Sequence, residues 1–224
     1  MKLAIFAATG GIGGQLLQQA VAAGHDVTAV ARSPEKLPPS WNGVRVVQAD
    51  LARPEPGRLE SAVAGADAVL SGLGPRPMAD AGVAAHGTEA IVRAMQATGV
   101  RRILVVSAAP NSTVPSPGRP NPPRRDPGEG FFMRNLFTPL IKVVLRQRYG
   151  DLALMEDLLR ESELDWTVLR PPRLTNGPLT GKYRTAFGQN LRRGALISRA
   201  DVADAMLAAV EQPATIRQAI GIAY

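Results

Sequence analysis

Short apolar runs alternate with longer amphipathic segments along the chain. The short runs have the length of buried β-strands, and the longer segments repeat their apolar residues every three or four positions, as helices do. The runs predict strands over residues 3–7, 27–31, 44–49, 68–72, 102–107, 166–169 and 219–224. The longer segments predict helices over residues 12–23, 59–64, 83–98, 153–163 and 201–211.

This alternation predicts an α/β fold. Near-continuous apolar strands need cover on both faces, and helices supply it when the sheet is parallel. Right-handed crossovers then lead to a doubly wound Rossmann fold with a mostly parallel sheet. Ligands of such sheets bind beyond the carboxyl ends of the strands, so the residues that directly follow each strand are the candidate site residues. We expect one domain that spans residues 1–224.

The amino-acid composition excludes several classes of functional site. The chain has no cysteine and two histidines, His25 and His86. Thiolate metal sites, disulfide frameworks and a cysteine nucleophile are therefore excluded, and we expect no metal site. The formal net charge of +7 suits anionic ligands. Because aromatic residues make up only 4% of the chain and no basic stripe alternates with them, we expect no nucleic-acid partner.

The apolar runs are also too short to cross a membrane, which takes about 20 apolar residues. We therefore expect no integral membrane segment. The apolar residues near the N-terminus end at Thr9, and we interpret them as a buried strand instead of a signal peptide. A cytoplasmic location follows as an expectation.

One stretch departs from the alternating pattern. We interpret residues 110–148, after the fifth strand, as an insertion made of a proline-rich loop and a basic amphipathic helix. Three interpretations stay open: a loop and helix packed on the domain, a lid over a substrate pocket, or a helix resting on a membrane surface. The insertion is also the candidate surface for a homodimer or a protein partner. The loop contains Pro110, Pro115, Pro117, Pro120, Pro122, Pro123 and Pro127.

A glycine-rich turn joins the first strand to the first helix. Such a turn lets a dinucleotide diphosphate approach the backbone, and the N–H groups at the helix start bind it. The candidate residues for this contact are Thr9, Gly10, Gly11, Ile12 and Gly13.

The end of the second strand indicates which nucleotide binds. An NAD site usually has a carboxylate there, whereas this chain has Arg32 and Ser33. A guanidinium group matches the 2′-phosphate of NADP, so we predict NADP(H) as the cofactor. Glu35, three residues after Arg32, leaves NAD open as the alternative.

The ends of the third and fourth strands complete the predicted nucleotide site. Asp50 and Leu51 are candidates for the adenine contact, although Asp50 is equally suited to cap a helix. Gly72, Leu73 and Gly74 are small or apolar, and they let the chain pass close to the ribose and nicotinamide.

At these residues the chain resembles the atypical short-chain dehydrogenase/reductases of the NAD(P)H-binding (NmrA-like) family, and within it the biliverdin reductase B and flavin reductase-like proteins. The resemblance covers nearly the whole chain except residues 110–148. It rests on residues 8–13, 31–33, 49–51, 164–174 and 177–181, and on the segment Ile-Ser-Arg-Ala-Asp-Val-Ala at 197–203.

The resemblance implies a Rossmann fold that binds NADPH across the sheet. It implies that Pro171 and Pro172 flank the nicotinamide and that Ser107, at the end of the fifth strand, matches the active-site serine of the family. The diphosphate, 2′-phosphate and adenine contacts that it implies fall on the same residues as those named above.

The sequence lacks the Tyr-x-x-x-Lys pair with which typical short-chain dehydrogenases transfer protons. Ala153 stands four residues after Tyr149, and Phe187 four residues after Tyr183. Hydride transfer to a flavin, quinone or tetrapyrrole-like acceptor needs little acid catalysis, because the charge spreads over a conjugated ring system. We therefore predict an NADPH-dependent oxidoreductase for such a small-molecule acceptor. The alternative is a non-catalytic NADP(H) sensor.

Three residues are candidates for catalysis in the predicted reductase. Ser107 is a candidate to orient the nicotinamide or the acceptor. Arg173 is a candidate to bind an anionic group of the acceptor, and Tyr183 to donate a proton or to stack.

Overall fold

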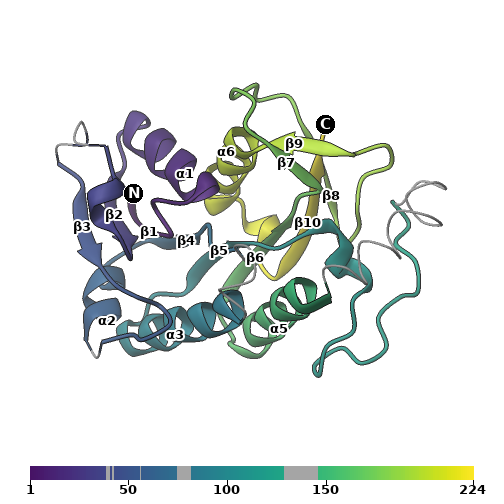
Figure 1. The fold of residues 1–224 in the computed structure, drawn as a ribbon, viewed down its shortest axis with the longest axis horizontal. Helices are drawn as coiled ribbons and strands as arrows, with labels where there is room; N and C mark the ends of the chain where they lie inside the picture. Colours follow the sequence, from purple (N-terminus) through teal and green to yellow (C-terminus); the bar gives the residue numbers. More distant parts are fainter. Residues whose placement is uncertain (39–40, 42, 56, 75–81, 129–145) are drawn as a thin grey trace.

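The computed structural model describes residues 1–38, 41, 43–55, 57–74, 82–128 and 146–224. Its centre is an eight-stranded sheet with the strand order β3-β2-β1-β4-β5-β6-β10-β8 (Figure 1). In that order the strands are β3 (Arg45–Gln48), β2 (Asp26–Ala31), β1 (Lys2–Phe6), β4 (Ala68–Ser71), β5 (Arg102–Val106), β6 (Asp165–Arg170), β10 (Gln218–Ala223) and β8 (Arg184–Phe187).

Seven of these strands run parallel, and only the edge strand β8 is antiparallel to its neighbour β10. The chain first builds outward from β1 through β2 to β3, and then crosses back to place β4 on the other side of β1. The order of the strands reverses between β1 and β4. This point is where doubly wound sheets bind their ligands.

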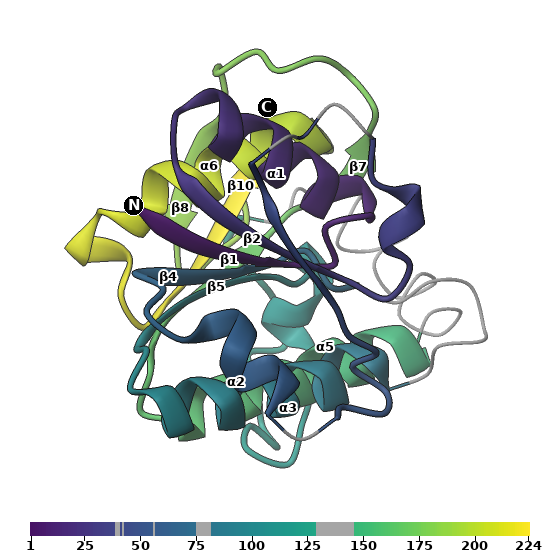
Figure 2. The same cartoon turned by 90° about the vertical axis from the view of Figure 1, so that its left-hand side faces the viewer.

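Helices cover both faces of the sheet (Figure 2). α1 (Gly11–Ala22) and α6 (Arg199–Val210) pack on one face, and α2 (Arg58–Val63), α3 (Val83–Thr98) and α5 (Arg146–Glu161) pack on the other. Two apolar clusters fill the layers: Leu16 and Met206 belong to the first, and Ile91 and Met155 to the second. The arrangement confirms the predicted doubly wound α/β fold.

All seven predicted strands are present, and so are the five helices predicted outside the insertion, with small shifts at their ends. The largest shift is in α5, which begins at Arg146 and not at residue 153. Three strands were not predicted: β7 (Arg173–Thr175), β9 (Leu196–Ser198) and the edge strand β8. β7 and β9 are too short to form an apolar run, and β8 is mostly exposed, so it contains polar residues where a buried strand would be apolar.

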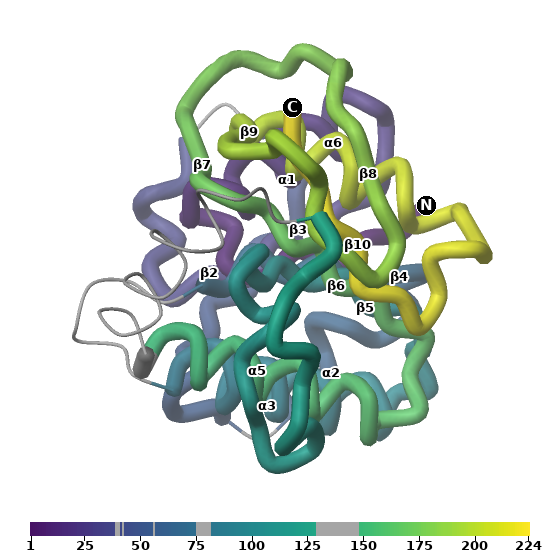
Figure 3. The backbone as a smooth tube through the Cα atoms, turned by 90° about the vertical axis from the view of Figure 1, so that its right-hand side faces the viewer, coloured from purple at the N-terminus to yellow at the C-terminus, as the bar shows by residue number. Residues whose placement is uncertain are grey.

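The described part of the predicted insertion is a packed segment. It begins with a 3₁₀ turn, η2 (Ala109–Thr113), and then passes over α5 (Figure 3). Gly118 donates its N–H to Asp157 of α5, and buried Asp126 accepts the N–H of Asn190. The predicted basic helix lies mostly outside the described residues, and residues 146–148 belong to α5.

Buried Arg102 joins four elements at the amino end of β5. Its guanidinium group donates to the carbonyl oxygens of Asp165, Ala209 and Val210, and to the hydroxyls of Thr167 and Thr215. Burial lowers the pKa of Arg102 to about 10, against the opposing charge of Asp165. The side chain therefore ties β6, the end of α6 and the 3₁₀ turn at Pro213–Thr215 to one another.

No helix in the described ranges combines the length and the apolar character that a membrane span needs.

Candidate cofactor-binding site

A cleft of about 520 Å³ opens at the carboxyl ends of β1, β2, β3, β4 and β5. Its volume lies within the range of small-molecule pockets, about 300–1,000 Å³. It brings together most of the residues that the sequence singled out: Thr9, Gly10, Gly11, Ile12, Arg32, Ser33, Asp50, Leu51, Gly72, Leu73, Gly74 and Ser107. These residues come from five separate strand ends, and the parallel sheet collects them at one edge.

The start of α1 offers backbone donors to this cleft. Gly10 is the N-cap and provides no side chain, and no acidic residue lies in the first turn. The first i→i−4 hydrogen bond of the helix runs from the N–H of Gly14 to the carbonyl oxygen of Gly10. The N–H groups of Gly11 and Ile12 come before it and have no hydrogen-bond partner in the described parts of the chain. Free N–H groups at the positive end of a helix favour an anionic ligand.

Gly13 was predicted to contact the diphosphate, but in the structure it packs between α1 and the ends of β1 and β4. It is buried and is absent from the residues that line the cleft. A Cβ atom at this position would lie 2.1 Å from the carbonyl oxygen of Ala7, and one on Gly72 would lie 2.7 Å from the nitrogen of Gly13. Gly13 and Gly72 therefore allow α1 to approach the ends of β1 and β4 closely.

At the β2 end of the cleft, the lining is cationic. Arg32, Ser33 and Lys36 line it, and Glu35 is exposed on the same 3₁₀ turn without reaching it. Asp50 lines the cleft too, and its Oδ1 accepts the N–H of Ala52 at 3.0 Å in a local turn. The carboxylate thus caps a turn and not a helix, since α2 begins only at Arg58.

An apolar wall continues the cleft beyond Asp50. Leu51 and Leu73 line it, and both pack against Gly87 of α3. A Cβ atom on Gly87 would lie 3.0 Å from Leu73 Cδ1 and 3.4 Å from Leu51 Cβ. The glycine therefore lets the two leucines pack against the helix and form an apolar wall of the cleft.

Ser107 stands at the end of β5 within a buried polar network. Its hydroxyl donates to Glu156 Oε1 at 2.7 Å and accepts from Asn111 Nδ2 at 3.1 Å. The carboxylate of Glu156 also accepts from Arg170 and from Arg160. Because two guanidinium groups face it, Glu156 acts as an acceptor, and the serine proton is directed away from the cleft.

Tyr149 is the tyrosine that lines the cleft. It lies near the start of α5, and the residue one helical turn later is the buried Ala153, where a short-chain dehydrogenase would have its lysine. Burial raises the pKa of the Tyr149 hydroxyl, although the charge of Arg148 acts in the opposite direction. The hydroxyl is thus protonated at neutral pH and able to donate a hydrogen bond.

Besides Gly13, four residues that were predicted to belong to the site are absent from the described lining of the cleft: Pro171, Pro172, Arg173 and Tyr183. Pro171 is buried, and its carbonyl oxygen accepts the N–H of Ala109 at 2.9 Å. Arg173 is exposed on β7. The Tyr183 hydroxyl donates to Asp204 at 2.7 Å on the α6 side of the sheet, and burial together with this bond raises its pKa.

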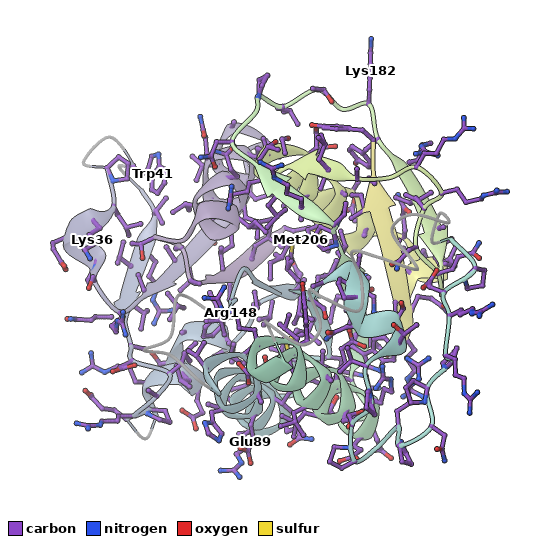
Figure 4. All side chains as sticks on the ribbon, turned by 45° about the vertical axis from the view of Figure 1, so that its right-hand side comes forward. Lys36, Trp41, Glu89, Arg148, Lys182 and Met206 are labelled. Atoms are coloured by element: carbon purple, nitrogen blue, oxygen red, sulfur yellow. The ribbon has the colours of Figure 1, made fainter. Side chains whose placement is uncertain are left out.

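Other residues line the cleft that the sequence did not suggest: Lys36, Val83, Ala108, Arg148, Tyr149, Leu152, Leu174 and Arg199. Figure 4 marks Lys36 after β2 and Arg148 at the start of α5, whereas Lys182 extends away from the molecule. Tyr149 could have been found, because it lies in the crossover between the fifth and sixth strands. Arg199 belongs to a helix start, which strand-end reasoning does not reach.

Comparisons with known proteins agree with this geometry. The family model for NAD(P)H-binding proteins matches residues 7–213 of the chain. Three similar solved structures each cover the full length of this chain. A short-chain dehydrogenase/reductase from Veillonella parvula, in complex with NADP, has a TM-score of 0.76 and 23% identity, with 94% of its own chain covered.

The other two structures are described as reductases. ChuY, an anaerobilin reductase from Escherichia coli O157:H7, has a TM-score of 0.74 and 23% identity over 97% of its chain. A protein from Streptococcus pneumoniae, provisionally assigned as an NADH-flavin reductase, has a TM-score of 0.72 and 25% identity over 99% of its chain. Since the family model spans nearly the whole sequence, the chain belongs to the NAD(P)H-binding family.

Proposed function

We propose that the protein is an NADPH-dependent reductase that transfers a hydride to a flat conjugated acceptor such as a flavin, a quinone or a tetrapyrrole. One observation carries the proposal: a single cleft connects the free N–H groups of the glycine turn, the cationic end of β2 and Ser107. Across the sheet, the end of β2 comes first, the glycine turn after β1 next, and Ser107 after β5 last, which is the order in which an extended dinucleotide would present its 2′-phosphate, its diphosphate and its nicotinamide.

The charges along the cleft favour NADP(H) over NAD(H). Arg32, Lys36, Arg148 and Arg199 line it, against the single carboxylate of Asp50 in the described lining. Arg32 and Lys36 flank Ser33 at the end of β2, where a 2′-phosphate would lie, and Glu35 stays outside. The similar Veillonella protein was solved with NADP, which supports the same choice here.

When bound, NADPH supplies a hydride from its dihydronicotinamide ring. Ser107 orients that ring. Because the serine hydroxyl donates its hydrogen bond to Glu156, its oxygen keeps a lone pair for the cleft and would accept the N–H of the carboxamide. Ala108 follows Ser107 directly, and it lines the cleft together with Leu152 and Leu174, whose apolar surface would limit the access of water.

Tyr149 is the proton donor that this arrangement offers to the acceptor. Its raised pKa makes it a weak acid, and Ala153, one helical turn later, stands where a lysine would lower that pKa. Reduction of an isolated carbonyl group is therefore disfavoured, since the developing alkoxide needs a stronger acid. A conjugated acceptor spreads the charge and needs only a hydrogen bond. The named activities of two similar structures, toward flavin and anaerobilin, support acceptors of this kind.

The test has two steps. Calorimetric titration with NADP⁺ and NAD⁺ measures cofactor binding, and we expect NADP⁺ to bind more tightly. Anaerobic oxidation of NADPH is then followed with a flavin, a quinone and biliverdin as acceptors, with Ser107→Ala as the matched variant. Turnover with at least one acceptor, lowered in the variant, supports the proposal. Tight NADP⁺ binding without turnover toward any acceptor would favour a non-catalytic sensor.

A further inference from the structure

Arg199 reaches the cleft from the opposite end of the chain to the glycine turn. It is the first residue of α6 and lines the cleft. A Cβ atom on Gly11 would lie 2.7 Å from both Cδ and Nε of Arg199. The arginine side chain therefore rests directly on the Cα atom of Gly11, and any larger residue there would displace it.

The guanidinium group is held in this place from one side. Its Nη1 donates to Asn176 Oδ1 at 2.6 Å. No carboxylate pairs with Arg199 in the part of the chain that the structure describes. Nε and Nη2 likewise have no hydrogen-bond acceptor among the described residues. The N–H donors on Nε and Nη2 are thus free to bind a ligand, and they lie beside the free N–H groups of Gly11 and Ile12.

The start of α6 is fixed by a second set of contacts. Ser198 caps the helix by accepting the N–H of Asp201. The buried carboxylate of Asp201 accepts the N–H groups of Thr180 and Gly181 and the hydroxyl of Tyr224. These bonds hold the loop that carries Asn176 against α6. The position of Arg199 is therefore set by the fold and does not depend on a ligand.

We propose that Arg199 is a cationic clamp for the cofactor diphosphate, which it would bind together with the neighbouring N–H groups at the start of α1. The inference rests on the cofactor assignment made above. A diphosphate carries two negative charges, and a guanidinium fork matches its oxygens with two parallel hydrogen bonds. Gly11 then has two functions: it exposes its N–H to the diphosphate, and it leaves room for Arg199.

This assignment separates Arg199 from Arg32 in a measurable way. The diphosphate is common to NAD and NADP, whereas the 2′-phosphate belongs to NADP alone. Loss of Arg199 should therefore weaken both nucleotides by a similar factor. Loss of Arg32 should weaken NADP and spare NAD.

Calorimetric titration of the full-length chain with NADP⁺, NAD⁺ and 2′-AMP tests the proposal. We expect Arg199→Met to lose at least tenfold in affinity for both dinucleotides and to bind 2′-AMP as the unchanged protein does, since 2′-AMP has no diphosphate. Arg192→Met is the matched control: it removes the same charge from an exposed position that does not line the cleft. It should bind all three ligands normally.

Two results would overturn the clamp: unchanged dinucleotide binding in Arg199→Met, or an equal loss for 2′-AMP, which would indicate a general change in charge or shape. If the unchanged protein bound neither dinucleotide, the proposed function itself would fail. Should Arg199→Met prove unstable by thermal melting, Asn176→Ala replaces it, because this change removes the orienting contact and keeps the charge. We expect it to weaken both dinucleotides severalfold, and wild-type affinities would again contradict the clamp.

Discussion

The hydroxyl of Ser107 donates a hydrogen bond to the buried carboxylate of Glu156, 2.7 Å away. Glu156 is fixed in turn by Arg170, whose Nε lies 3.0 Å from the same carboxylate oxygen. Toward the cleft, the Ser107 oxygen is therefore a hydrogen-bond acceptor and not a donor. This polarity distinguishes the site from one in which a serine and a tyrosine both donate to a substrate carbonyl.

Replacing Ser107 tests that polarity. We expect Ser107→Ala to lower kcat/KM for NADPH by about tenfold to a hundredfold, because the carboxamide loses its orienting acceptor. The melting temperature should change little. Glu156→Gln should lower kcat/KM when it is made in the wild-type protein. It should have no further effect when it is made in Ser107→Ala, since Glu156 acts through the serine. Additive losses in the double variant would show that Glu156 acts by another route.

Arg32→Ala tests the choice of nucleotide. A charge-assisted contact to a phosphate contributes about 1.5–3 kcal/mol, so NADP⁺ should bind at least tenfold more weakly. The affinity for NAD⁺ should stay within about twofold. Titration of both nucleotides against both proteins measures the difference, and an equal loss for NAD⁺ and NADP⁺ would remove Arg32 from the 2′-phosphate site.

Two neighbouring glycines of α1 should respond in opposite ways to alanine. A Cβ atom on Gly13 would collide with the Ala7 carbonyl at 2.1 Å, whereas one on Gly14 would meet its nearest atom at 3.6 Å, an ordinary contact. We expect Gly13→Ala to be destabilised by several kcal/mol or not to fold, as overpacking predicts. Gly14→Ala should be unchanged or up to about 1 kcal/mol more stable, because alanine favours a helix interior. Chemical denaturation of both variants compares them.

The adjacent arginines Arg101 and Arg102 offer a second matched pair. Arg101 is exposed and pairs with Asp165 at 3.4 Å, while buried Arg102 donates five hydrogen bonds. Lysine keeps the charge but cannot reproduce a five-donor fork. Arg102→Lys should therefore lose about 2–4 kcal/mol of unfolding free energy, from buried acceptors left unpaired. Arg101→Lys should lose less than about 0.5 kcal/mol. Similar stabilities of the two variants would contradict this assignment.

Asp201 should make stability depend on pH in the acid range. Burial disfavours its charge, but hydrogen bonds from Tyr224, Thr180 and Gly181 outweigh this and lower its pKa to about 2. The unfolded value is about 3.9, so the contribution of about 2–3 kcal/mol is complete above that pH and is lost as the pH falls toward 2. Asp201→Asn should be less stable near neutral pH, with the difference shrinking below pH of about 4. A constant difference across this range would contradict the assignment.

The sequence predicts most of the sheet because its strands are buried and therefore apolar, which is a local property. It also predicts the strand-end residues Gly10, Arg32 and Asp50, since a parallel sheet gathers strand ends at one edge. Tyr183 shows the limit of such reasoning. It follows residues 177–181, which carry part of the family resemblance, yet its hydroxyl donates to Asp204 and does not reach the cleft. Whether a side chain reaches the cleft depends on helix packing, and the contact between Arg199 and Gly11 depends on how α6 lies beside α1.

That contact has a consequence for synthesis. Gly11 leaves the ribosome long before Arg199, which is 188 residues further along the chain. A shortened product that ends before α6 would contain the glycine turn and the β2 end, yet one wall of the nucleotide cradle would be missing. A product that contains α6 would then retain the cofactor more tightly, and a product without α6 would lose the stabilisation that the bound cofactor gives.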